Sequence, residues 1–115
     1  MFIQLNHKSL KIYEATRELA KEIYVVSMKP VEEKFNMIQQ MRRAALSVKL
    51  NLAEGSTRKS LNERRRFYEV ARGSVVEIDA VLETAVDLNY LKNDQLNSVA
   101  NLLNKCFAML SNMID

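Results

Sequence analysis

A cluster of arginine and lysine in the middle of the sequence carries the strongest signal for a chemical role. Residues 42–72 hold nine basic and three acidic side chains, net +6, whereas residues 73–115 carry a net charge of −4. Basic side chains bind phosphates by charge and hydrogen bonds, so this stretch is a candidate anion or nucleic-acid surface. The same asymmetry permits head-to-tail contacts between copies. The residues predicted to form one patch are Lys49, Arg58, Lys59, Arg64 and Arg65. A merely solvated, charged helix end is the other interpretation.

Residue types suited to catalysis or metal binding are scarce. The one histidine, His7, lies near the start of the chain, far in sequence from the one cysteine, Cys106. The chain lacks the paired Glu-x-x-His motifs of di-iron bundles, and it also lacks a Gly-rich phosphate loop and a Cys-x-x-Cys pair. Cys106 falls on an apolar stripe and is predicted to be an inert buried thiol. We therefore predict no enzymatic activity, no catalytic residue, no metal site and no cofactor.

A stripe of polar residues precedes and overlaps the basic cluster. Spacings of four, four and three place its members on one helix face, and they are Arg43, Ser47, Asn51 and Glu54. The residues predicted to face them from the next helix are Arg72, Gly73 and Ser74. In one interpretation these residues form a buried network, in which Arg43 or Arg72 pairs with Glu54. In the other, they lie at the water-exposed edge of the helices.

Apolar residues at alternating spacings of three and four predict four helices, which would position these groups. The predicted helices cover residues 9–28, 30–55, 60 to 88 or 90, and 93–113. The connections between them are short, which favours antiparallel neighbours. We therefore predict an all-α protein, with residues 1–115 forming a single antiparallel up-down-up-down four-helix bundle.

Local signals mark the predicted helix ends. Gly55 follows an apolar pattern and is predicted to close its helix in the left-handed conformation. Ser60 and Glu63 have the spacing of a capping box, and Asn93 is a predicted N-cap. Gly73 lies inside the third helix, where glycine costs roughly 0.5–1 kcal/mol relative to alanine. We therefore predict that a neighbouring helix approaches closely at Gly73.

The last two helices have more apolar residues than one stripe needs. The additional residues are Tyr68, Val75, Val76, Leu82, Val86, Leu102, Phe107 and Met109. They broaden the core of a monomer in one interpretation. In the other, they form an oligomer interface of about 800 Å² per partner.

Three features that the sequence lacks predict the cellular location of the protein. No apolar run approaches the roughly 20 residues of a membrane span. The start, MFIQLNHKSL, lacks the long apolar stretch of a secretory signal. A single cysteine excludes an internal disulfide framework. We therefore predict a cytoplasmic protein without membrane contact.

Two segments, MRRAALSVKLNLAEG and GSTRKSLNERRRFYEVARGSVVEID, resemble the 23S rRNA intervening-sequence proteins, also called the S23-type family. That family shows L-R-R-A-A-x-S-[IV]-x-x-N-[IL]-A-E-G, then a basic loop, then A-R-G-S. The matching positions include Arg42, Arg43, Ser47, Asn51, Glu54, Gly55, Arg58, Phe67, Arg72, Gly73 and Ser74. Lys49 and Leu50 depart from the pattern, because they replace a proline and a small residue.

The resemblance implies an antiparallel four-helix bundle that assembles as a ring-like homopentamer. It also implies a relationship to the accessory subunit of diversity-generating retroelements, a basic pentamer that engages nucleic acid and a reverse transcriptase. Together, residues and resemblance predict a non-enzymatic homo-oligomer that binds RNA, or a complex of RNA and protein, through the basic patch. The alternative is a protein-interaction or structural module with no nucleic-acid role.

Overall fold

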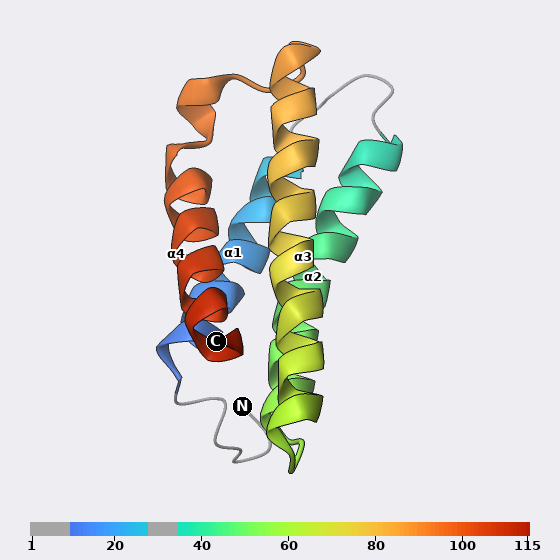
Figure 1. Cartoon of the computed structure of the whole chain (residues 1–115). Coiled ribbons are helices and arrows are strands. Elements are labelled where there is room, and N and C mark those ends of the chain that lie inside the picture. The colour runs from blue at the N-terminus through green and yellow to red at the C-terminus, as the bar shows by residue number, and fades with distance from the viewer. Residues whose placement is uncertain (1–9, 28–34) are drawn as a thin grey trace.

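The protein is a bundle of helices, seen here in a computed structural model that describes residues 10–27 and 35–115 (Figure 1). Within these residues the chain contains four α-helices and no strand, which confirms the predicted all-α class. The α-helices are α1 (Lys11–Ser27), α2 (Phe35–Ser56), α3 (Leu61–Asp87) and α4 (Asn97–Ile114), and a short 3-10 helix, η2 (Asn93–Gln95), precedes α4. The ends predicted at residues 9, 28 and 30 lie outside the described ranges.

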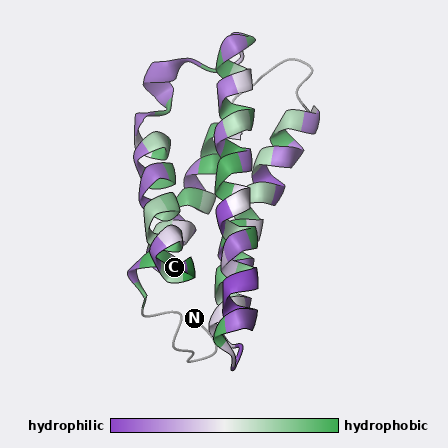
Figure 2. Cartoon of the chain, in the orientation of Figure 1, coloured by the Kyte–Doolittle hydropathy of each residue, from purple (hydrophilic) through white to green (hydrophobic). Residues whose placement is uncertain are grey.

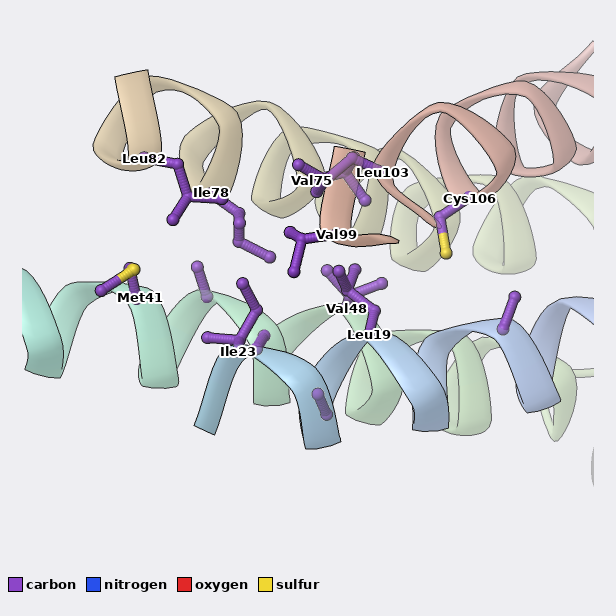
Figure 3. Packing of buried hydrophobic residues seen from close by; sticks show 14 of the residues in the cluster. Leu19, Ile23, Met41, Val48, Val75, Ile78, Leu82, Val99, Leu103 and Cys106 are labelled. Carbon is purple, nitrogen blue, oxygen red and sulfur yellow. The ribbon is translucent and has the colours of Figure 1, made fainter. Parts of the chain in front are cut away.

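The four α-helices surround one apolar core. Helix α2 packs against α1 and α3, and α4 packs against α3 and α1, so that every helix has two neighbours (Figure 1). Apolar side chains from all four helices point into the space between them (Figure 3). Hydrophilic residues predominate at the start of α3 and in the connection before α4 (Figure 2). Fully buried members of the core include Leu19, Ile23, Val48, Leu52, Ile78, Val99 and Leu110.

Short polar contacts close the helix ends. The backbone N–H of Glu63 donates to Ser60 Oγ over 3.1 Å, which confirms Ser60 as the N-cap of α3. Beyond α3, Asn89 takes the left-handed conformation with φ at 64°, one that asparagine tolerates well. The predicted role of Asn93 is wrong, because it begins η2 and its carbonyl accepts from the N–H of Leu96 over 3.0 Å.

Neither glycine has its predicted role. Gly55 is buried inside α2 with a negative φ, so it does not close the helix in the left-handed conformation. A Cβ on Gly55 would lie 2.8 Å from Phe67 Cβ and 2.8 Å from Tyr68 Cε1. Gly73 is exposed, and a Cβ there would have no described atom beyond its own turn within 4 Å. The close helix approach predicted at Gly73 is therefore found at Gly55, where α3 meets α2.

Small polar side chains also connect α2 and α3 at positions farther from Gly55. Ser74 Oγ donates to Ser47 Oγ over 2.8 Å, and Ser74 is buried. Asn51 Nδ2 donates to the same Ser47 Oγ over 3.0 Å and to the Ser47 carbonyl over 2.8 Å. A buried hydroxyl without a partner would be costly, so these bonds let two helices meet through polar groups without that cost.

The additional apolar residues of α3 and α4 divide into three groups. Tyr68, Val75 and Leu82 are buried in the core. Three others pack partly buried against it, namely Val86, Leu102 and Met109. Val76 and Phe107 remain exposed. Most of these residues therefore broaden the core of one chain, and two are left on its surface.

The two glycines provide a matched pair of substitutions. We expect Gly55→Ala to lower the free energy of unfolding by about 1–3 kcal/mol, because the new methyl group overlaps Phe67 and Tyr68. We expect Gly73→Ala to raise it by roughly 0.5–1 kcal/mol, because alanine is the better helix former and the site is open. The midpoint of urea unfolding at constant slope measures both changes. Equal effects of the two substitutions would contradict the close approach at Gly55.

The serine pair can be tested by a double-mutant cycle. We expect Ser47→Ala and Ser74→Ala to show a coupling free energy of about 0.5–1.5 kcal/mol, because the two hydroxyl groups bind each other. The cycle cancels the change in helix propensity that each alanine brings. Urea unfolding of the wild type, both single variants and the double variant gives the four free energies required. Additive effects would show that the two hydroxyl groups are not bonded in solution.

Candidate nucleic-acid interface

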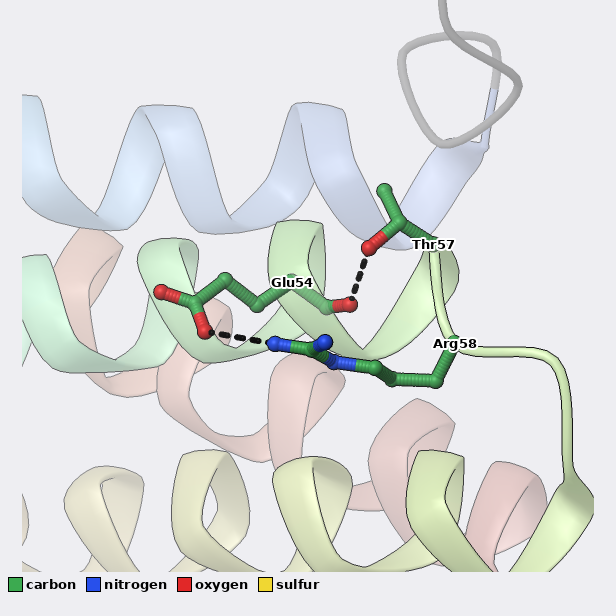
Figure 4. Close-up of polar contacts among 3 residues, drawn as sticks. All are labelled: Glu54, Thr57 and Arg58. Carbon is green, nitrogen blue, oxygen red and sulfur yellow. Dashed lines mark hydrogen bonds and ion pairs between the residues drawn. The ribbon is translucent and has the colours of Figure 1, made fainter.

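The connection between α2 and α3 is a tight turn made of residues 57–60. The N–H of Thr57 donates to the Glu54 carbonyl, and the N–H of Arg58 donates to the Gly55 carbonyl, each over 3.1 Å. Thr57 Oγ1 adds a bond of 2.7 Å to the same Glu54 carbonyl (Figure 4). The basic residues on either side of the turn are therefore held at one end of the bundle.

Arg58 is partly committed to contacts within the chain. Its guanidinium carbon lies 4.8 Å from the centroid of the Phe67 ring, within the range of a cation–π contact. Its Nη2 atom lies 3.5 Å from Glu54 Oε2 (Figure 4). The Arg58 carbonyl accepts from Arg64 Nε over 2.7 Å, so both arginines also brace the turn. Arg58 Nε is buried and has no partner among the described residues.

Three cations at this end remain free of ion pairs within the described part of the chain. They are Lys59 and Arg65, both predicted members of the patch, and the adjacent Arg66, and all three are exposed. Arg58 and Arg64 lie beside them at the same turn. Lys49 differs, because its Nζ lies 5.9 Å from the centroid of the Tyr13 ring and therefore faces α1. The structure thus brings together four of the five predicted basic residues and places Lys49 on the α1 side of α2.

The predicted polar network is present only in part. Ser47, Asn51 and Ser74 meet as described above, whereas Arg43 and Glu54 are exposed. The buried pairing of Glu54 with Arg43 or Arg72 is wrong. Glu54 instead pairs with Arg58, four residues ahead, in an exposed contact of the kind that contributes about 0–1 kcal/mol.

Two other arginines join helices in ways that the sequence reasoning missed. Arg72 Nη1 donates to Ser111 Oγ of α4 over 3.1 Å, and its guanidinium carbon lies 5.7 Å from the Phe107 ring centroid. Arg42 Nε donates to Ser27 Oγ of α1 over 2.7 Å. Both partners lie far away in the sequence, so helical spacing contains no signal for them. These arginines stabilise the packing of helices and are not part of the free basic surface.

Cys106 is buried, as the sequence predicts. Burial raises the pKa of the Cys106 thiol to about 11, so the thiol remains neutral and weakly nucleophilic near pH 7. No three His, Cys, Asp or Glu side chains in the described ranges gather as metal ligands would. His7 lies outside those ranges. Within the described ranges, every helix is either too short or too polar to span a lipid bilayer.

Comparison with known proteins agrees with this architecture. A crystal structure of a protein of unknown function from the S23 ribosomal protein family of Bacteroides thetaiotaomicron VPI-5482 matches with a TM-score of 0.81. The two chains are 22% identical, and the match covers 90% of this chain and 98% of the other. No curated protein matches the chain in sequence. The family profile described as 23S rRNA-intervening sequence protein matches residues 8–112. Because this match spans nearly the whole chain, the protein belongs to the 23S rRNA intervening sequence protein family.

Proposed function

We propose that the protein is a non-enzymatic, cytoplasmic RNA-binding accessory protein that acts as a ring-like homo-oligomer of antiparallel up-down-up-down bundles. The observation that supports RNA binding is the group of exposed cations at the α2–α3 end, Lys59, Arg65 and Arg66, which no described carboxylate neutralises. The family name refers to a sequence within 23S rRNA, which indicates a context and specifies no activity.

The geometry of this end suits phosphate groups. Lys59 precedes the capped start of α3 and Arg65 follows it; both are exposed, and backbone N–H groups at a helix start also favour anions. Arg58 is held against Phe67, so its remaining hydrogen-bond donors are presented with little loss of side-chain freedom. One copy offers few contacts with phosphate groups. In a ring, an RNA long enough to reach several copies would make these contacts with each of them, and its overall affinity would rise.

The second candidate function is a protein-interaction module without a nucleic-acid role. The exposed apolar pair Val76 and Phe107, on α3 and α4, favours this candidate. Both side chains line a hollow of about 220 Å³ that lies well along α3 from the basic end. The two candidates differ in their expected dependence on salt, because only the RNA complex releases counterions from phosphates.

Lys59 is the best position for a test of RNA binding. It is exposed and makes no hydrogen bond, ion pair or cation–π contact with a described residue, whereas a change at Arg58 would also disturb the turn. We expect Lys59→Glu to weaken binding of a generic single-stranded RNA. We also expect it to reduce the slope of log affinity against log salt by about 0.7 for each phosphate group that the variant no longer neutralises. Fluorescence anisotropy at about 50 to 200 mM salt measures both quantities.

Lys21→Glu is the matched control, because Lys21 is an exposed lysine on α1 and the substitution changes the charge equally. RNA affinity of this variant should stay close to that of the wild type. Equal loss of affinity in the two variants would mean that total charge, rather than the α2–α3 end, governs binding. No binding by the wild type at the lowest salt, with the oligomer intact, would refute the RNA-binding proposal in favour of the protein-interaction module.

A further inference from the structure

A cleft of about 450 Å³ lies between α3 and α4, in the half of α3 that is remote from the basic end. Its apolar lining includes Leu82, Val86, Leu96 and Leu103. Pockets for small molecules have volumes of roughly 300–1,000 Å³ and combine apolar walls with a few polar groups. A protein–protein interface instead takes about 20–30 residues from each side, whereas ten residues line this cleft. The size of the cleft therefore favours a small molecule as its occupant.

Three exposed carboxylates line the α3 side of the cleft, namely Asp79, Glu83 and Asp87. They recur at every fourth residue, so they are neighbours on the helix surface and repel one another. No ion pair with a described residue relieves this repulsion. The sequence between Arg72 and Lys92 contains no lysine or arginine, so α3 itself supplies no cation to this row.

The position of the acidic row within α3 adds a second electrostatic cost. Helix α3 ends at Asp87, and its last turn has no basic residue. The carbonyl groups at the end of a helix carry a partial negative charge, which favours cations there and disfavours carboxylates. Departures from such local rules are expected at functional sites. A cation bound in the cleft would relieve both the repulsion within the row and its conflict with the helix dipole.

The spacing of the carboxylates indicates a linear cation. At a rise of about 1.5 Å per residue, the positions of Asp79 and Asp87 are roughly 12 Å apart along α3. One metal ion cannot contact groups spread over this length, and the described residues contain no cluster of three metal ligands. On the opposite wall, Asn93 and Asn97 contribute amide groups, whose oxygens can accept hydrogen bonds from ammonium groups.

We propose that the α3–α4 cleft binds a linear aliphatic polyamine, a chain of ammonium groups joined by short methylene segments. The ammonium groups lie against Asp79, Glu83 and Asp87, and the methylene segments cover the apolar side chains of Leu82 and Val86. Burial of these methylene groups adds to the attraction between the charges. This site goes beyond the proposed RNA binding, because it uses no residue of the basic end.

Calorimetric titration of the wild type with spermidine tests the proposal at about 150 mM salt, where exposed charges are largely screened. We expect saturable binding and a higher midpoint of thermal unfolding, because a ligand of the folded state stabilises it. Hexaamminecobalt(III) is the matched ligand control, since it carries the same positive charge as spermidine without methylene groups. It should bind at least about 10-fold more weakly, because it has no apolar surface to bury. Equal affinity for the two cations would overturn the proposal.

The matching variant is Glu83→Gln with Asp87→Asn, which removes two charges with little change in shape. We expect about 100-fold weaker spermidine binding, from about 10-fold for each hydrogen bond to a charged group that is lost. The variant should fold, because it relieves repulsion. Glu14→Gln with Glu18→Gln is the control, since these exposed α1 carboxylates have the same spacing and lie outside the cleft. This control should keep the wild-type affinity.

Three further results would overturn the polyamine site. The first is a folded wild type that shows no saturable binding of spermidine. The second is unchanged affinity in the cleft variant. The third is an equal loss of affinity in the cleft and α1 variants, which would mean that total charge governs binding. No RNA is present in these titrations and Lys59 lies outside the cleft, so failure here and failure of RNA binding remain distinguishable.

Discussion

The close approach of α2 to α3 at Gly55 is the constraint on which the basic end of the molecule depends. Without a side chain at this position, the backbone of α2 can lie against Phe67 and Tyr68, where even a methyl group would overlap them. Phe67 therefore contacts both α2 and the turn, because its Cβ lies against Gly55 and the Arg58 guanidinium stacks on its ring. One glycine thus allows the two helices to meet closely beside the ring on which Arg58 is stacked.

This contact also explains how a short polar turn can be held firmly beside an apolar core. The hydroxyl groups of Ser56 and Tyr68 lie 3.4 Å apart next to Gly55, and Ser47 and Ser74 bind each other farther along the same pair of helices. Because α3 is 27 residues long, its basic start and its acidic last turns are far apart.

Much of this fold could be predicted from local sequence patterns. The predictions that were wrong share a physical origin. Apolar spacing located the helices, and the Ser60 cap gave the start of α3, because these signals act within one or two turns. The close approach predicted at Gly73 occurs at Gly55 instead, because a glycine in the sequence does not reveal which face of its helix a neighbour covers. The bond from Arg72 to Ser111 joins residues 39 positions apart, beyond the reach of any local spacing. The contact of Glu54 with Arg58 is local, and its four-residue spacing could have revealed it.

Nuclear magnetic resonance spectra of the folded protein test the close approach of α2 to α3 most directly, because they report the surroundings of the Gly55 α-protons. We expect strong nuclear Overhauser effects from the Gly55 α-protons to the Phe67 β-protons and the Tyr68 ring. We also expect the aromatic rings to displace the chemical shifts of the Gly55 α-protons. Gly73 provides the internal reference, because a Cβ placed there would meet no described atom beyond its own turn within 4 Å. Gly55 α-protons that show neither effect, in a sample that retains its helices, would contradict the close approach of α2 to α3 at Gly55.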